Sequence, residues 1–276
     1  MIDRLLVSGA CTPLGQAVIA QLLDALQLPP DRLIAVAQAP ERIEALRRRG
    51  VRVRVARPER PADWPAALAG AGRVLLLCLA TAQPLFDAVL ATGVRHIVCA
   101  QDICGEAQHR ALSRAGIDFS VLRIARCFED LQEMMASSER DGVWATAMGD
   151  GVAACVARDD AARAVAAALL RARDVNAVVD ITGPQALSAQ LIASAFSQEW
   201  GRNIRVEPLA PPELQARARA TGEPERRVRL QLAFDAVARA GELAQPGPGV
   251  LALTGAAPIT LRQHLRRPAP PVSRPR

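Results

Sequence analysis

The sequence predicts an α/β protein built on a doubly wound, parallel Rossmann-type sheet, with a smaller C-terminal substrate lobe. Two patterns predict this architecture: short apolar segments alternate with helical segments along the first two thirds of the chain, and most of the apolar segments are continuous. Continuous apolar strands separated by helices are typical of a parallel sheet that is covered on both faces. Right-handed crossovers between such strands give the doubly wound topology.

The predicted strands and helices alternate along the chain as this topology requires. Strands are expected at residues 4–8, 33–37, 51–55, 74–79, 96–100, 119–123 and 177–182. Helices are expected at residues 13–26, 40–49, 84–92, 106–114 and 159–171. The third strand alternates Val and Arg, so we expect it near an edge of the sheet.

The pattern changes after Gly183 and Pro184. A helix begins at Ser188, and three prolines then precede a charged helical stretch at residues 213–240. We therefore expect a dinucleotide-binding domain over residues 1–182 and a smaller lobe over residues 183–265, above the carboxyl edge of the sheet. The Pro- and Arg-rich residues 266–276 are expected to form a disordered tail.

The composition limits the class of protein. No apolar run is long enough to span a bilayer, and the first residues lack the pattern of a signal peptide, so we expect a cytoplasmic protein with no membrane partner. The net charge of +6 comes from Arg alone, because the chain has no Lys. Aromatic residues make up 3% of the chain, too few for the stacking platforms of a nucleic-acid surface. We expect a small-molecule substrate as the partner, and a monomer or homodimer.

The cysteines and histidines predict neither a disulfide framework nor a metal centre. No two of the six cysteines form a C-x-x-C pair, and the three histidines lie far apart in the sequence, whereas metal sites and disulfide scaffolds have recognisable spacings. The residues are Cys11, Cys78, Cys99, Cys104, Cys127 and Cys155, and His96, His109 and His264.

Residues 9–15 lie between the first strand and the first helix, where a phosphate-binding turn is expected. Gly9 would allow a tight turn, Gly15 would allow close packing, and the helix N-terminus would offer N–H groups to a pyrophosphate. Thr12 replaces the middle glycine of the usual pattern, and Pro13 has no N–H. Because Thr is a good N-cap and Pro suits the first helical position, Thr12 and Pro13 can also be explained as a helix start alone.

The end of the second strand decides which dinucleotide would fit. An acidic residue there binds the ribose hydroxyls of NAD, whereas an Arg nearby accepts the 2′-phosphate of NADP. This chain has Gln38, which can bind a ribose by hydrogen bonding but cannot neutralise a phosphate. Arg42 and Arg57 could supply the charge from other directions, so the choice between NAD and NADP stays open.

Five segments, taken in order, resemble the NmrA-like family of atypical short-chain dehydrogenases/reductases, which includes bacterial NAD(P)H:quinone oxidoreductases. The first two are residues 9–15, similar to G-A-T-G-x-L-G, and Val121-Leu122-Arg123 with Phe128-Glu129, similar to L-R-x-x-x-F-x-E-N. The third is Gly149-Asp150-Gly151 with residues 156–162. The last two are Thr182-Gly183-Pro184 with Leu187-Ser188 and Gly201-Arg202, and Leu253-Thr254-Gly255 with Pro258 and Leu261.

The resemblance implies NAD(P)H as the cofactor and a small quinone-like or conjugated carbonyl substrate. The residues that it and the turn pattern place at the cofactor are Gly9, Cys11, Thr12, Pro13, Leu14, Gly15, Gln38, Arg57, Leu79 and Ala80. Gln38 and Arg57 depart from the family, in which an Arg and an Asp are common at these places. The Tyr–Lys pair of ordinary short-chain dehydrogenases cannot form, because the chain contains neither residue type.

Four further residues are candidates for the substrate side, together with one for catalysis. His109 is the candidate acid, because its ordinary pKa suits proton transfer near neutrality; a solvent-exposed helix histidine is the alternative. Gln101 and Asp102 follow the fifth strand at the ligand-binding edge of the sheet. Cys127 and Phe128 are expected at the same cleft.

Three functions therefore remain open. The first is an NAD(P)H-dependent reductase, in which the cofactor supplies the hydride and the protein supplies orientation. The second is a regulator that senses the dinucleotide without chemistry. The third is a protein that has lost the cofactor and uses the cleft for a non-redox reaction, such as cyclisation or isomerisation, or for ligand binding.

Overall fold

A computed structural model of the chain describes residues 4–57, 59–77, 83–100, 110, 114, 116–171 and 176–267. It forms two compact units. The sheet unit comprises Met1–Ile124, Asp159–Ile181 and Gly249–Gly255, and the lobe unit comprises Ala125–Arg158, Thr182–Pro248 and Ala256–Arg276. No helix in the described ranges is both long enough and apolar enough to cross a membrane.

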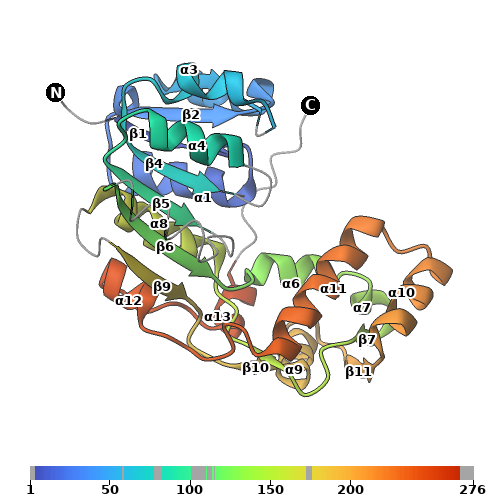
Figure 1. Cartoon of the computed structure of the whole chain (residues 1–276). Coiled ribbons are helices and arrows are strands. Elements are labelled where there is room, and N and C mark those ends of the chain that lie inside the picture. Colours follow the sequence, from blue (N-terminus) through green and yellow to red (C-terminus); the bar gives the residue numbers. More distant parts are fainter. Residues whose placement is uncertain are drawn as a thin grey trace. The chain divides into compact units, whose positions relative to one another are not determined.

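The sheet unit is built on seven parallel strands in the order β3-β2-β1-β4-β5-β6-β9 (Figure 1). The strands are β1 (Arg4–Val7), β2 (Leu33–Ala37), β3 (Arg52–Val55), β4 (Ala71–Leu77), β5 (His96–Ala100), β6 (Asp118–Ile124) and β9 (Ala177–Ile181). The predicted doubly wound parallel sheet is therefore confirmed. The strand with alternating Val and Arg, β3, lies at the edge as expected.

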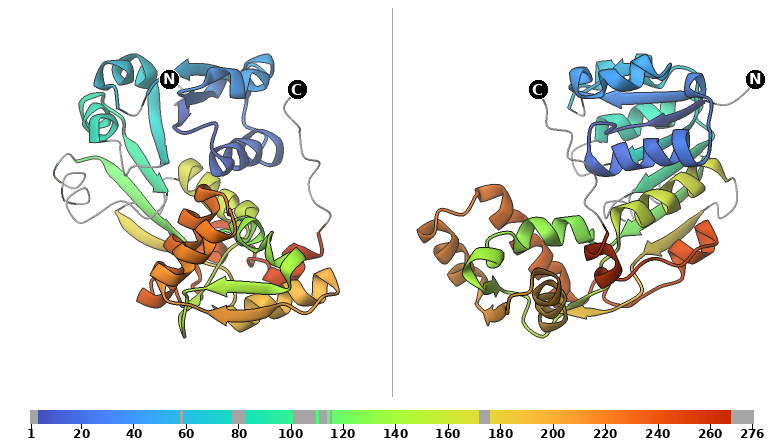
Figure 2. Two further views of the ribbon diagram at one scale, coloured as in Figure 1. Left: turned by 90° about the vertical axis from the view of Figure 1, so that its right-hand side faces the viewer. Right: turned by 180° about the vertical axis from the view of Figure 1, so that it is seen from behind.

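Helices cover both faces of this sheet, α1 and α8 on one face and α4 on the other (Figures 1 and 2). The helices are α1 (Pro13–Ala20), α2 (Glu44–Arg48), α3 (Trp64–Leu68), α4 (Gln83–Ala91), α8 (Arg158–Leu170) and α12 (Gly249–Thr254). A single π-helical segment, Gln21–Ala25, continues α1. The helix predicted at 106–114 falls outside the described residues, apart from Arg110 and Arg114.

Burial on both faces explains why most strands of this sheet are continuous apolar runs. Every residue of β2 and of β5 is buried. On the face that carries α3 and α4, the main cluster joins Leu6, Ile34, Leu76 and Ile97 to Trp64. Burial of such side chains removes apolar surface from water, which is the main stabilising contribution in a sheet of this kind.

The lobe unit contains two short two-stranded sheets and several helices. In the sheets, β7 (Val143–Thr146) pairs parallel with β11 (Arg205–Pro208), and β8 (Val152–Ala153) pairs antiparallel with β10 (Leu187–Ser188). The helices are α6 (Phe128–Met135), α7 (Ser138–Asp141), α9 (Ala189–Trp200), α10 (Pro211–Ala220), α11 (Glu225–Ala240) and α13 (Leu261–Leu265). The charged stretch predicted at 213–240 is thus two helices, separated by a turn that contains Gly222 and Pro224.

The unit boundaries differ from the predicted division at residue 182. The segment Ala125–Arg158 belongs to the lobe unit, and Gly249–Gly255 belongs to the sheet unit. The reason lies in α6, whose apolar side chains Phe128, Leu131 and Met135 pack into the core that contains Phe196 and Phe234. An amphipathic helix directly after a strand fits either unit, and only this long-range packing decides between them.

Candidate functional site

The 9–15 turn leaves β1 at the point where the strand order reverses, between β2 and β4. The turn is tied to both neighbours: Ala10 N–H donates to the carbonyl of Val36 on β2 at 3.0 Å, and Ser8 N–H donates to the carbonyl of Leu75 on β4 at 3.0 Å. Ligands of open α/β sheets bind outside the carboxyl ends of the strands at such a switch point. The turn therefore lies where a dinucleotide would be expected.

Glycine is required at both ends of the turn. Gly9 has a φ of +64°, which other residues rarely adopt. A Cβ atom at Gly15 would lie 2.3 Å from the carbonyl oxygen of Gly9, so no other residue fits without a backbone shift. The two glycines therefore keep the compact turn geometry that brings a helix N-terminus close to a ligand.

Thr12 caps α1, as its residue type predicts. Its Oγ1 accepts a hydrogen bond from Gly15 N–H at 3.0 Å, and its backbone is extended. Pro13 follows at the first helical position. In the described part of the chain, the N–H groups of Cys11 and Leu14 have no acceptor, so these are the two backbone donors that the turn can offer to a phosphate.

The ends of β2 and β3 adjoin at the same edge of the sheet. Ala56 N–H donates to the carbonyl of Ala37 at 3.3 Å, and the exposed Gln38 follows directly. Beyond it, Arg57 donates to one oxygen of Asp63, from its backbone N–H at 3.1 Å and from Nε at 3.3 Å. The backbone hydrogen bond from Arg57, followed by its side-chain hydrogen bond and charge, lowers the pKa of Asp63.

Five predicted site residues lie outside the described ranges. They are Leu79, Ala80, Gln101, Asp102 and His109. The carboxyl ends of β4 and β5, which carry the first four of them, are thus known only up to Leu77 and Ala100. Their proposed contacts with nicotinamide and substrate stay predictions.

Cys127 and Phe128 belong to the lobe unit. Phe128 is fully buried in its core, and its ring lies 5.4 Å from that of His264. This position accounts for Phe128 by packing, and its contact with a substrate stays a prediction. Cys127 is 9% exposed, and burial, with the neighbouring carboxylates Asp130 and Glu129, raises the pKa of its thiol to about 12. Cys127 is therefore a neutral thiol near neutral pH.

Glu129 has a structural role that the sequence analysis did not assign. Its two carboxylate oxygens lie 3.3 and 3.1 Å from the N–H of Arg158, the first residue of α8. Asp130 accepts a hydrogen bond from the Arg158 side chain at 3.2 Å and forms an ion pair with Arg126 at 3.6 Å. A carboxylate at a helix N-terminus is favourable because it meets unpaired N–H groups and the positive end of the helix dipole. The only indication of this role in the sequence was that Glu129 falls in the segment that resembles the family's L-R-x-x-x-F-x-E-N motif.

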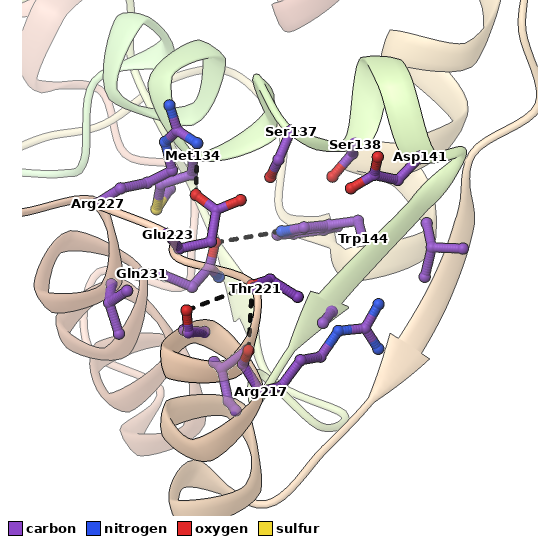
Figure 3. Close-up of a pocket in the computed structure, with 15 residues that line it drawn as sticks. Met134, Ser137, Ser138, Asp141, Trp144, Arg217, Thr221, Glu223, Arg227 and Gln231 are labelled. Atoms are coloured by element: carbon purple, nitrogen blue, oxygen red, sulfur yellow. Dashed lines mark hydrogen bonds and ion pairs between the residues drawn. The ribbon is translucent and has the colours of Figure 1, made fainter. Parts of the chain in front are cut away.

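The lobe unit also contains a cavity of about 80 Å³ between α7 and β7 on one side and α10 and α11 on the other (Figure 3). Trp144 Nε1 donates to Gln231 Oε1 at 3.2 Å on its wall, and Glu223 forms an ion pair with Arg227 at 2.5 Å. None of the predicted site residues that the structure describes lines this cavity. No motif in the sequence indicated it. Arg217, Glu223 and Arg227 on its walls form ion pairs, and no observation assigns the reaction to this cavity.

No protein-family model matches the chain. The chain is 23% identical over 237 residues to quinone oxidoreductase 2 of Escherichia coli (strain K12), covering 79% of this chain and 82% of that protein. It is 25% identical over 240 residues to the NAD(P)H azoreductase of Xenophilus azovorans, covering 80% and 82%.

The fold has close counterparts among solved structures. The NADPH complex of the E. coli quinone oxidoreductase QOR2 superposes with a TM-score of 0.85 at 22% identity, covering 95% of this chain and 98% of that chain. Within the described residues, no group of three or more His, Cys, Asp or Glu side chains is arranged to hold a metal ion. The sequence relatives and the shared fold agree with the order of the motifs: this chain is similar to the NmrA-like atypical short-chain dehydrogenases/reductases.

Proposed function

We propose that this protein is an NAD(P)H-dependent oxidoreductase that reduces a small quinone-like or conjugated carbonyl substrate. The observation that carries the proposal is the 9–15 turn, in which Gly9 and Gly15 allow the compact geometry that begins α1 at the switch point of the sheet. The relatives named above are a quinone oxidoreductase and an azoreductase, both reductases of conjugated acceptors by their names.

The residues of the turn would hold the dinucleotide by its phosphates. The N–H groups of Cys11 and Leu14, together with the N-terminal end of α1, would bind the pyrophosphate. Gln38 would donate to or accept from a ribose hydroxyl. The bound cofactor supplies the hydride, so the chain needs to orient the substrate and to provide a proton.

We propose His109 as the group that provides this proton, with Gln101 and Asp102 contacting the substrate. The chain has no Tyr and no Lys, so a proton at the substrate oxygen must come from another side chain or from water. A histidine can give up a proton near neutral pH. The thiol of Cys127, protonated by its burial, can pack or donate weakly but does not act as a nucleophile.

Titration of the full chain with NADH and NADPH by calorimetry, followed by steady-state reduction of a benzoquinone, tests the proposal. We expect saturable binding and loss of reduced-nicotinamide absorbance only when the quinone is present. The variant Gly15→Ala should lose at least about tenfold in dinucleotide affinity, because its Cβ must displace the backbone at Gly9. Gly93→Ala is the matched control, since a Cβ there meets nothing within 4 Å.

The other two functions predict different results in the same experiment. Pro13, which brings no N–H to the turn, is the observation in favour of a fold that has lost its cofactor. Absence of binding by both dinucleotides would support that function and overturn the proposal. Tight binding without turnover of any quinone would support a sensing role instead.

A further inference from the structure

At the carboxyl edge of β2 and β3 a cation, Arg57, is held by a neighbouring carboxylate. In this parallel pair Ala37 lies opposite Val55, so the chain leaves both strands at the same edge, into Gln38 and Arg57. This edge also carries the 9–15 turn, which is bonded to β2 through Val36. Arg57 therefore lies on the side of the turn where the adenosine half of a dinucleotide binds in sheets of this topology.

Gln38 cannot balance the charge of a phosphate on the adenosine ribose. Its exposed amide is neutral and carries one acceptor and two donors, which suit hydroxyl groups. A 2′-phosphate is favoured by a cation, and an arginine fork suits it best because two of its N–H groups can bind one phosphate. The cation must then come from beyond the end of β2.

Arg57 is held in a way that leaves N–H groups of its guanidinium available to a phosphate. Its backbone N–H and its Nε both donate to the same oxygen of Asp63, at 3.1 and 3.3 Å. The contacts of this guanidinium with other described residues are made at Nε, and the side chain is 41% exposed. The carboxylate thus holds Nε, and the hydrogen bonds of this guanidinium within the described residues leave its terminal amino groups for a ligand.

Asp63 is well suited to this positioning role. It ends the short 3-10 segment Pro61–Asp63, and its side chain is 23% exposed. The hydrogen bonds from Arg57 and the nearby charge of Arg60 lower the pKa of Asp63. The carboxylate therefore stays ionised and continues to accept the hydrogen bonds of Arg57. Orientation before binding reduces the side-chain entropy that a phosphate contact would otherwise cost.

We propose that Arg57, oriented by Asp63, binds the 2′-phosphate of the dinucleotide and makes this chain select NADPH over NADH. The inference rests on the proposed dinucleotide-dependent function. It places the cation that selects NADPH after β3, where the family commonly has an acidic residue, and not after β2, where the family commonly has an Arg. Asp63 acts as a positioning residue and does not touch the cofactor.

Calorimetric titration of the full chain with 2′,5′-ADP and with 5′-ADP tests the proposal without any hydride transfer. The wild-type protein should bind 2′,5′-ADP at least about tenfold more tightly, the effect of one charge-assisted arginine contact. Arg57→Gln should remove most of this ratio, and Asp63→Asn should reduce it less. The ratio should also fall as salt is added, because the contact is exposed.

Arg60→Gln is the matched control, because it removes the same charge three residues away from Arg57. It should leave the ratio near its wild-type value. If Arg60→Gln and Arg57→Gln lowered the affinity ratio equally, the preference would come from the summed positive charge of this region and not from a contact with Arg57, and the proposal would be overturned. Equal binding of the two ligands by the wild type would also overturn it. Equal binding together with quinone turnover would leave the proposed function standing, whereas binding of neither ligand or dinucleotide would overturn both.

Discussion

The two units of the molecule bury different sets of polar side chains. The sheet unit packs an apolar cluster, with side chains such as Leu6, Ile34 and Leu76, between strands and helices, and its buried polar side chains include Ser8 and His96. The core of the lobe unit includes Thr146, Gln231 and Asp235, which are at most 6% exposed. An apolar core tolerates changes of shape, whereas a buried polar group needs a particular partner. Substitutions in the buried polar groups of the lobe unit should therefore have larger effects than volume-conserving substitutions in the apolar cluster of the sheet unit.

The polar network of the lobe unit connects β7 to α11. Asp235 accepts hydrogen bonds from Thr146 Oγ1 at 2.8 Å, Gln231 Nε2 at 2.8 Å and Ala147 N–H at 2.7 Å. Trp144 Nε1 extends the network by donating to Gln231. Every one of these bonds joins parts of the chain that are distant in sequence or lie on different turns of a helix, so the network fixes the position of α11 against β7.

The largest effect is expected at Gly183, where two backbone segments of the lobe unit cross. A Cβ atom there would lie 1.9 Å from the carbonyl oxygen of Cys155, and Gly183 N–H donates to the carbonyl of Ala154. Gly183→Ala should lower the free energy of unfolding by about 3 kcal/mol or more, because the backbone itself must move. Chemical denaturation followed by circular dichroism measures the loss.

Gly201→Ala is the control for this substitution in the same unit. Gly201 has a φ of +63° and open space around its Cβ position, so the cost should be only the conformational strain of about 1–2 kcal/mol. Equal losses in the two variants would show that the crossing at Gly183 can relax, and the contrast between the units would then rest on the polar network alone.

The next largest effect is expected when the acceptor at the centre of the network is changed. Asp235→Asn replaces one acceptor oxygen by a donor and leaves at least one of three donors unpaired, at a cost of about 2 kcal/mol. Asp24→Asn, an exposed residue of the sheet unit paired with Arg49, should cost about 0.5 kcal/mol or less. Urea unfolding of both variants beside the wild type makes the comparison.

The difference in unfolding free energy between the wild type and Asp235→Asn should change with pH in a defined direction. Burial raises the pKa of Asp235 above its ordinary value of 3.8. Its contribution to stability is therefore complete below pH 3.8 and is lost as the pH rises through the higher pKa of the folded state. The wild type should therefore lose part of its higher free energy of unfolding, relative to Asp235→Asn, as the pH rises through that pKa. If this difference increased with pH instead, hydrogen bonding to the carboxylate would outweigh the effect of burial.

An intermediate effect is expected at Glu129, whose carboxylate meets the first N–H of α8. Glu129→Gln keeps one oxygen acceptor but loses the charge, and should cost about 1 kcal/mol in the free energy of unfolding. Glu133→Gln on the same helix removes only a pair with the exposed Arg226 and should change stability by less than about 0.5 kcal/mol. Thermal unfolding of the two variants distinguishes the capping contact from a general charge effect.

The contrast between the units also explains what could be predicted from the sequence. The strands Leu33–Ala37 and His96–Ala100 were predicted with the bounds that the structure gives, since burial on both faces leaves an apolar run that is visible locally. The assignment of α6 to the lobe unit could not be predicted, because it depends on packing against Phe196 and Phe234, far along the chain. Asp235 lies in the charged helical stretch expected at residues 213–240, and its burial depends on the same kind of long-range packing.

In the candidate site, too, features formed within a few residues could be predicted, whereas features that depend on tertiary structure could not. Thr12 could be identified as an N-cap because the hydrogen bond to Gly15 is formed within four residues. The pairing of Arg57 with Asp63 could not be predicted, because it requires a turn after β3 that brings the carboxylate back to the end of the strand. The polar neighbours of an exposed arginine follow from tertiary structure, which no local pattern encodes.

The smallest effect is expected at the one buried histidine of the sheet unit among the described residues. His96, the first residue of β5, is 4% exposed; its Nε2 lies 3.2 Å from Ser120 Oγ, and its Nδ1 is buried without a hydrogen-bond partner. Burial, with a contribution from Arg73, lowers the pKa of His96, and Asp118 opposes this shift. The folded state therefore keeps the imidazole neutral at pH values where the unfolded chain is already protonated.

This shift gives the sheet unit a group whose contribution to stability is lost in mild acid. The contribution of His96 is present above its ordinary pKa of 6.5 and is lost as the pH falls below that value, because the unfolded state then binds the extra proton. His96→Gln should flatten the decline in unfolding free energy between about pH 6.5 and 5. His264→Gln, which changes a histidine of the lobe unit, should leave the decline as it is; flattening by His264→Gln instead would place the acid-sensitive group in the other unit.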